Sequence, residues 1–271
     1  MSDVAETIYQ TDFTGAFLVA DQPESRILVA DSWLVSHGTV IAMDLHRQRF
    51  FNSCQQRHQM DSDILQHYWQ AALKKIPRDG LWFPRIELAG DPDHPRLQMR
   101  IRPAPPLKET VRLSLCPSPD RRQAPRHKGP DMGWLMQMRQ QVLAQGADEG
   151  IIVSSKGYLL EGLTTSLLWW EKRQGKQILC AVPDANRILP GTIRQLILSI
   201  AEQENIPIAY RRVQLEQLAG CDVWAVNALH GIRPAIPWQK ALFMPKHDAE
   251  TEKRLKTWRL AIEACAAPLP V

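Results

Sequence analysis

The chain has 271 residues, of which 44% are hydrophobic and 23% are charged. This composition is typical of a globular protein with one large or two modest domains, and it excludes a disordered or fibrous chain. Lysine and arginine together (33) exceed aspartate and glutamate (29) by a net charge of only +4, which is too small and too scattered to indicate a nucleic-acid partner.

Membrane, secreted and metal-binding classes are not expected either. The longest apolar stretches have the length of a strand, and the acidic N-terminus lacks an apolar run, so neither a transmembrane segment nor a signal peptide is predicted. The cysteines, at positions 54, 116, 180, 221 and 265, are dispersed and form no CxxC pair. We therefore expect buried free thiols, no metal site and a cytoplasmic protein.

Hydrophobic patterning predicts a mixture of strands and helices in the first half. Residues 26–35 and 39–45 read as two strands joined by a tight turn at Ser36–Gly38. Residues 61–76 carry apolar side chains at helical spacing, with cap candidates at 61–63 and a stop at 77–80. Further strands are predicted at 82–88, 97–103 and 110–116.

Residues 116–131 are rich in proline and arginine and are not expected to hold regular structure. We interpret them as an interdomain segment whose basic side chains face water. The predicted organisation is an α/β (or α+β) fold with an N-terminal domain at 1–120, a segment at 121–130 and a C-terminal domain at 131–271.

The second half continues the mixed pattern. An amphipathic helix is predicted at 131–145 with Gly146 at its end, another opens at Pro190–Thr192, and a closing helix covers 250–266. Strands are predicted at 150–154, 157–160, 167–171, 177–182 and 222–229.

Several residues could take part in chemistry, although each also has a simpler explanation. Thr192 and Ile193 begin a helix, whose first backbone N–H groups can bind an anion or only water. Arg49 could bind a phosphate or lie on a solvated surface. Lys128 becomes a nucleophile if burial or nearby cations lower its pKa, whereas an average lysine is solvated.

Two further positions follow apolar strands. Glu161 ends such a strand, so its carboxylate either faces water or is buried with a cationic partner such as a protonated ring nitrogen. Asn227–Gly231 forms the exit of another strand, where a turn can aim backbone N–H groups at an anion.

The order of these segments is more specific than any of them alone. Lys128, Gly146–Gly150, the segment GYLLEG at 157–162, LPGTIR at 189–194 and VNALHGIRP at 226–234 together resemble the class IV aminotransferases. This family comprises pyridoxal-phosphate enzymes of fold type IV, including branched-chain and D-amino-acid aminotransferases and aminodeoxychorismate lyases. The resemblance is clear over residues 125–235 and weaker over 26–55.

The resemblance implies a role for each residue. Lys128 is similar to the lysine that binds pyridoxal 5'-phosphate covalently, and Glu161 to the glutamate that keeps the pyridine nitrogen protonated. The positions that resemble the family's cofactor-binding residues also include Arg49, Thr192, Ile193, Asn227 and Ala228, and those that border the substrate include Leu229 and His230. The implied fold is an N-terminal α/β sandwich and a C-terminal pseudo-barrel in a homodimer, with the cofactor between the domains.

Three functions remain open. The pattern Asn227-Ala228-Leu229-x-Gly231-Ile232 looks more like the lyase branch, which releases pyruvate and 4-aminobenzoate in folate biosynthesis. A dicarboxylate substrate also suits Arg47, Arg126 and Arg233. The alternatives are an aminotransferase acting on branched-chain or D-amino acids, and a family member without turnover.

Overall fold

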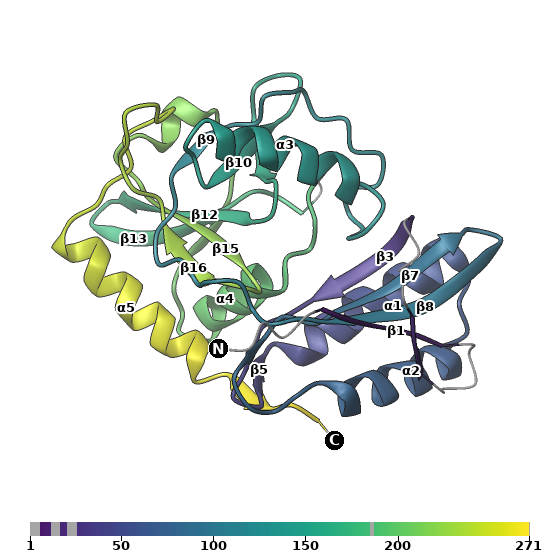
Figure 1. Cartoon of the computed structure of the whole chain (residues 1–271). Helices are drawn as coiled ribbons and strands as arrows, with labels where there is room; N and C mark the ends of the chain where they lie inside the picture. The colour runs from purple at the N-terminus through teal and green to yellow at the C-terminus, as the bar shows by residue number, and fades with distance from the viewer. Residues whose placement is uncertain (1–5, 12–16, 21–25, 185–186, 271) are drawn as a thin grey trace. The chain divides into compact units, whose positions relative to one another are not determined.

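The computed structural model describes residues 6–11, 17–20, 26–184 and 187–270. The chain divides into two compact units, each made of more than one segment. Figure 1 colours the chain by residue number, so that each segment can be found by its colour. Unit 1 comprises residues 1–107, 127–132 and 265–271, and unit 2 comprises residues 108–126 and 133–264. The predicted domain limits, with the N-terminal domain ending at residue 120 and the C-terminal domain beginning at residue 131, stay a proposal.

Unit 1 is built on an antiparallel sheet with the strand order β2-β1-β8-β7-β3. Two helices cover one face of this sheet (Figure 1), where side chains such as Leu88 and Met99 share a core with Phe50 and Leu65. The elements are β1 (Thr7–Thr11), β2 (Phe17–Val19), β3 (Ile27–Ser32), β7 (Arg85–Asp91), β8 (His94–Ile101), α1 (Met43–His58) and α2 (Ser62–Lys75).

A smaller sheet of unit 1, with the order β17-β5-β4-β6, contains the predicted tight turn. His37 and Gly38 both have positive φ, 46° and 74°, as a two-residue turn between right-twisted strands requires. The strands are β4 (Val35–Ser36), β5 (Thr39–Ile41), β6 (Leu81–Trp82) and β17 (Ala266–Pro268). The pairing of β17 with β5 brings the C-terminal residues into unit 1.

Local signals explain α2, whereas α1 was not predicted. The carboxylate of Asp61 caps α2 by accepting hydrogen bonds from the backbone N–H groups of Asp63 and Ile64, at 2.7 and 3.2 Å. The predicted strand at 39–45 is wrong after Ile41, because α1 begins at Met43.

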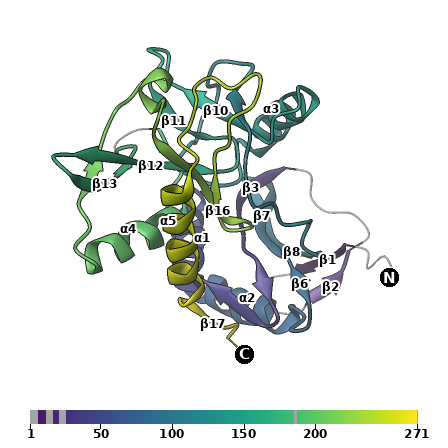
Figure 2. The same ribbon diagram turned by 90° about the vertical axis from the view of Figure 1, so that its left-hand side faces the viewer.

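Unit 2 contains two sheets, with the strand orders β11-β10-β9 and β14-β13-β12-β15-β16. Helices α4 and α5 pack against the second sheet, as Figure 2 shows. The strands are β9 (Leu113–Leu115), β10 (Glu149–Val153), β11 (Leu159–Gly162), β12 (Ser166–Arg173), β13 (Lys176–Ala181), β14 (Ile208–Tyr210), β15 (Asp222–Asn227) and β16 (Gly231–Pro234). The helices are α3 (Met132–Ala144), α4 (Thr192–Gln203), the 3₁₀ helix η1 (Leu215–Leu218) and α5 (Ala249–Glu263).

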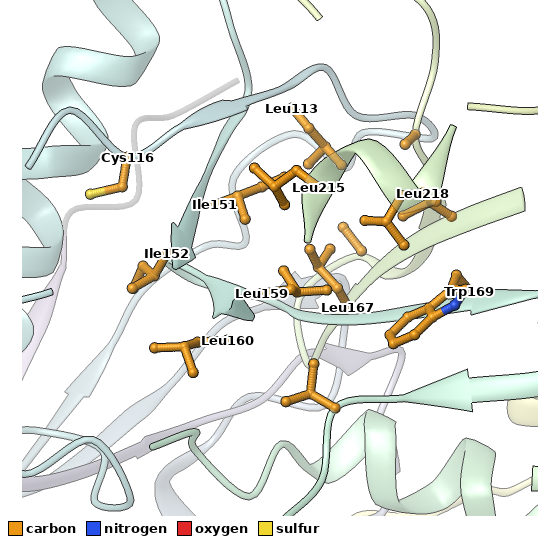
Figure 3. Packing of buried hydrophobic residues seen from close by; sticks show 14 of the residues in the cluster. Leu113, Cys116, Ile151, Ile152, Leu159, Leu160, Leu167, Trp169, Leu215 and Leu218 are labelled. Carbon is orange, nitrogen blue, oxygen red and sulfur yellow. The ribbon is translucent and has the colours of Figure 1, made fainter. Parts of the chain in front are cut away.

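The core of unit 2 is formed by aliphatic side chains from both sheets. Figure 3 shows Ile151, Leu159, Leu167 and Leu218 close together, and each is at most 2% exposed. The second half of the chain therefore holds strands and helices, and an apolar cluster joins its two sheets. The predicted mixed α/β fold class is confirmed.

Other expectations have mixed outcomes. Cys54, Cys116 and Cys180 are buried, but Cys265 is exposed, so the expectation that the cysteines are buried is wrong there. In the described part of the chain, every helix is too short or too polar to form a membrane span.

Candidate active site

Lys128 lies beside the edge strand of the unit 1 sheet. Its carbonyl oxygen accepts a hydrogen bond from the backbone N–H of Ala30 at 2.7 Å. Gly129 follows with φ of +136°, and a Cβ atom at this position would lie 2.8 Å from the Cα of Val29. Because only glycine allows such a close approach, Gly129 fixes the lysine segment against β3.

We expect Gly129→Ala to lower the free energy of unfolding by about 1–3 kcal/mol, because the added Cβ meets backbone that cannot move away cheaply. Gly133→Ala is the matched control, since no atom lies within 4 Å of a Cβ there. Urea denaturation of both variants measures the difference. Equal stability of the two variants would contradict the close approach of Gly129 to the backbone of β3.

The surroundings of the Lys128 amine lower its pKa and so favour its reactive, neutral form. Burial lowers its pKa to about 8, and the positive charges of Arg49, Arg85 and Arg102 act in the same direction. The negative charge of Asp31 opposes them but does not restore the ordinary value.

The reactivity of this amine should therefore reach its half-maximum near pH 8 in the cofactor-free protein. An ordinary lysine has a pKa of about 10.4, so it is still almost fully protonated at that pH. Acylation at a series of pH values, followed by peptide mass spectrometry, measures the midpoint at Lys128. A midpoint near 10 would show that the amine is solvated.

Asp31 links β3 to α1 through a buried group of charges. Its carboxylate accepts hydrogen bonds from Nε and Nη2 of Arg49, both at 2.8 Å, and from Nδ1–H of His46 at 2.7 Å. Burial favours the protonated acid, but Arg49 and His46 outweigh it and hold the pKa of Asp31 well below its usual range. Burial lowers the pKa of His46, so its ring is neutral at pH 7.

Glu161, in β11, is buried at 6% exposure in unit 2. Its Oε1 accepts a hydrogen bond from the backbone N–H of Leu189 at 3.0 Å and a short one from Nη1 of Arg122. Within the described ranges, no group donates a hydrogen bond to its Oε2. Burial raises the pKa of Glu161 to about 7, although the positive charge of Arg122 acts in the opposite direction. A further cationic partner would therefore stabilise the ionised carboxylate.

Arg122 was not predicted as a site residue, and the expectation that the basic side chains of 116–131 face water is wrong for it. Arg122 is only 5% exposed. Its Nε donates to Oδ1 of Asp120 at 2.9 Å, and Nη2 donates to the carbonyl of Arg187 at 2.9 Å. The guanidinium therefore holds Glu161, Asp120 and the segment before α4 together.

The start of α4 lies close to the end of β11 and to β12. Gly191 precedes the helix, and a Cβ atom there would lie 2.5 Å from Oγ of Ser166. Thr192 and Ile193 are the first helical residues, and a helix offers the N–H groups of its first turn no acceptor of its own. This part of the chain can accept the oxygen atoms of an anion.

Asn227 closes a turn between β15 and β16. Its Oδ1 accepts hydrogen bonds from the backbone N–H groups of Leu229 and His230, at 3.1 and 2.8 Å, and its Nδ2 donates to the carbonyl of Thr164 at 3.3 Å. Ala228 lies inside this turn. Burial lowers the pKa of His230 to about 4, and its neutral Nδ1 accepts from the N–H of Lys108.

The structure thus brings the predicted residues together in two groups. Unit 1 holds Lys128 and Arg49, and unit 2 holds Glu161, Thr192, Ile193 and the turn at 227–230. The three arginines that suited a dicarboxylate are scattered: Arg47 is exposed and donates to Gln66, Arg126 donates to the carbonyl of Asp184, and Arg233 is buried in β16.

Comparison with known proteins identifies the family. The sequence profile described as amino-transferase class IV matches residues 28–237, which is more than half of the chain. The chain belongs to the class IV aminotransferase family. The family uses pyridoxal 5'-phosphate, so this class IV chain is a pyridoxal-phosphate-dependent enzyme, and the predicted resemblance is confirmed.

Solved structures share the fold at low sequence identity. A hypothetical aminotransferase from Mycobacterium tuberculosis, in a PLP-bound form, is 17% identical with a TM-score of 0.75, and the match covers 96% of this chain and 98% of that one. A branched-chain aminotransferase from Thermoproteus uzoniensis with norvaline is 17% identical with a TM-score of 0.77, covering 97% and 99%. A fold IV transaminase from Curtobacterium pusillum is 18% identical with a TM-score of 0.66, covering 95% and 99%. No curated protein matches the sequence.

Proposed function

We propose that the chain is a 4-amino-4-deoxychorismate lyase of folate biosynthesis, which releases pyruvate and 4-aminobenzoate and binds pyridoxal 5'-phosphate covalently through Lys128. The observation that carries the choice of the lyase is the turn at Asn227. Its sequence, Asn227-Ala228-Leu229 followed by Gly231 and Ile232, looks like that of the lyase branch, and the Asn227 side chain holds its shape through the three hydrogen bonds described above.

The residues of unit 2 fit the cofactor. The Oε2 of Glu161 is available to a protonated ring nitrogen, and a buried carboxylate is stabilised by such a partner. The bare Cα of Gly191 lets the hydroxyl of Ser166 lie close to the start of α4, and the N–H groups of Thr192 and Ile193 suit a phosphate. When bound, the cofactor supplies an electron sink for the carbon beside the substrate amine.

Lys128 would be the residue that moves the proton. An amine whose pKa is about 8 can both release and accept a proton near neutral pH, as general acid-base catalysis requires. The donors of the Arg49 guanidinium group would hold the cofactor phosphate. The pair with Asp31 fixes the orientation of these donors.

The turn at 227–230 would border the cofactor and the substrate. Asn227 and Ala228 lie on the side of the cofactor in this proposal, and Leu229 and His230 on the side of the substrate. Because His230 is neutral at pH 7, it would contact the substrate without adding positive charge. The proposal includes a cytoplasmic homodimer, as the family resemblance implies, and sedimentation analysis tests the dimer.

An aminotransferase is the second candidate. The structures that share the fold are described as aminotransferases, including the branched-chain enzyme with norvaline. For such an enzyme, Lys128 and Glu161 would keep the same roles, and a keto acid would be needed to complete the reaction.

The products separate the two candidates. Purified enzyme loaded with pyridoxal 5'-phosphate is incubated with 4-amino-4-deoxychorismate without a keto acid, and pyruvate and 4-aminobenzoate are quantified. Equal amounts of both products support the lyase. If turnover instead depends strictly on added 2-oxoglutarate or pyruvate as acceptor, the enzyme is an aminotransferase.

A further inference from the structure

Glu149, the first residue of β10, is a buried acidic residue that the proposed function does not use. Its side chain is fully buried in unit 2. Burial raises the pKa of Glu149, whereas hydrogen bonds from Thr164 and the positive charge of Arg233 act in the opposite direction. Burying a carboxylate is costly unless donors bind its oxygen atoms, so the donors around Glu149 indicate what the side chain does.

The donors come mainly from the loop between β11 and β12. Oε1 of Glu149 accepts a hydrogen bond from the backbone N–H of Thr164 at 3.2 Å, and Oε2 accepts one from the Thr164 hydroxyl at 2.5 Å. Oε1 also accepts a hydrogen bond from the backbone N–H of Gly150 at 3.1 Å. The carboxylate therefore binds Thr164 at two points, through its backbone and through its side chain.

This loop closes tightly over the carboxylate. The backbone N–H of Gly162 donates to the carbonyl of Thr165 at 2.8 Å, which folds the loop back on itself. A Cβ atom at Gly162 would clash with the Thr165 hydroxyl and would lie 3.2 Å from Cγ of Glu149. Because the loop packs directly on the side chain of Glu149, the position of Thr164 depends on that side chain.

Thr164 in turn binds Asn227. The carbonyl of Thr164 accepts a hydrogen bond from Nδ2 of Asn227 at 3.3 Å. Oδ1 of Asn227 accepts hydrogen bonds from two backbone N–H groups of the turn at 227–230. A continuous series of hydrogen bonds therefore runs from Glu149 through Thr164 and Asn227 to this turn.

His230, at the end of the turn, reports on its position. Its Nδ1 accepts a hydrogen bond from the backbone N–H of Lys108 at 3.2 Å. Burial lowers the pKa of His230 to about 4, and the positive charges of Arg233, Arg139 and Lys108 act in the same direction. A solvated imidazole has a pKa of about 6.5, so a ring that leaves this place should titrate at a higher pH.

We propose that Glu149 is a positioning residue, which acts through Thr164 and Asn227 to hold the turn at 227–230 against the substrate. Glu149 itself contacts neither substrate nor cofactor. The inference rests on the proposed function in one respect, namely that this turn borders the cofactor and the substrate. Loosening the turn should therefore weaken substrate binding more than it slows the proton transfer by Lys128.

The first experiment removes the hydroxyl that Oε2 binds. Thr164→Val keeps the shape of the side chain, and NMR of the histidine-labelled, cofactor-loaded protein measures the pKa of His230, whose signal is identified with His230→Gln. We expect this pKa to lie about one pH unit or more higher in Thr164→Val than in the wild type, because the ring becomes solvated as the turn moves. The same pKa in both folded proteins would overturn the proposal.

The direction of the change in Glu149→Ala identifies its cause. Loss of a negative charge alone would lower the pKa of His230 or leave it unchanged, whereas release of the turn raises it. A rise in Glu149→Ala, with none in Glu202→Ala on the exposed side of α4, therefore supports the proposal. A fall, or no change, in a folded Glu149→Ala protein would refute it.

A double variant tests whether Glu149 acts through Thr164. Glu149→Ala and Thr164→Val break the same series of hydrogen bonds, so their effects on the pKa of His230 should not add. The double variant is expected to match Glu149→Ala. Effects that add fully would show that the two residues act on the turn independently, and the proposed route would be wrong.

Kinetics measure the consequence for the reaction. With the substrate that the product assay identifies, Thr164→Val should raise KM about 10-fold, as loss of a hydrogen bond implies, with a smaller change in kcat. Glu202→Ala should change neither constant. An unchanged KM in Thr164→Val, with or without a fall in kcat, would contradict the positioning of a substrate-binding turn.

The NMR measurement needs no reaction, so it separates this inference from the proposed function. If the pKa of His230 rises in the variants but neither lyase nor aminotransferase products form, Glu149 holds the turn and the proposed function fails. If pyruvate and 4-aminobenzoate form but Thr164→Val changes neither the pKa of His230 nor KM, the proposed function stands and the role of Glu149 fails.

Discussion

Replacement of Lys128 with alanine is expected to abolish covalent retention of pyridoxal 5'-phosphate and to reduce turnover by about 10²–10⁴-fold, the range that a positioned acid-base group contributes. The reason is that the variant lacks both the amine that binds the cofactor and the group that moves the proton. The amine is also the one whose pKa burial and three arginines lower to about 8.

Borohydride reduction followed by peptide mass spectrometry measures the attachment, and product release measures the turnover. Lys156→Ala is the matched control, because Lys156 is exposed in the turn between β10 and β11. The control should keep both the attached cofactor and the activity. A Lys128→Ala protein that still holds the cofactor after reduction and dialysis would show that another lysine is used.

Replacement of Asp31 with asparagine is expected to lower the free energy of unfolding by about 3–5 kcal/mol at pH 7. The variant leaves Arg49 buried without the carboxylate that binds two of its nitrogen atoms, while His46 loses a charged acceptor. Urea denaturation measures the loss. Asp79→Asn is the control, because this side chain is exposed and lies outside the charged group.

The pH dependence provides a second measurement of the same interaction. Since the pKa of Asp31 is held well below its usual range in the folded protein, its ionisation stabilises the fold fully above the unfolded pKa, about 3.9. This stabilisation is lost as the pH falls below that value. The gap between the wild type and Asp31→Asn should therefore narrow from pH 7 to pH 3. A gap that is the same at both values would mean that the carboxylate charge is not the cause.

Elements with local signals could be predicted from the sequence. The turn at His37–Gly38 and the helix that Asp61 caps depend on neighbouring residues, and both are present. Helix α1 could not be predicted in the same way. Its sequence, MDLHRQRFFNSCQQRH, is largely polar, and it buries polar groups such as His46 and Arg49 against the sheet together with Phe50. Its burial depends on Asp31, which precedes it in the chain by more than ten residues.

The candidate site shows the same limit. The sequence leaves open whether the Glu161 carboxylate faces water or is buried with a cationic partner, and it predicts that Arg122 faces water because proline and arginine dominate its neighbourhood. The two residues are 39 positions apart, and composition contains no information about such a contact. The family resemblance identified the lysine, and the tertiary structure identified the charges around it.

Unit 1 is formed by segments that are far apart in the sequence, and this affects the order in which the two units can fold during translation. Because this unit needs residues 127–132 and the strand β17, a nascent chain that has only reached residue 107 lacks both the lysine segment and an edge of the smaller sheet. Unit 2 is finished at residue 264, before β17 is translated. Completion of unit 1 therefore has to wait until β17 has left the ribosome, by which time all of unit 2 has been translated.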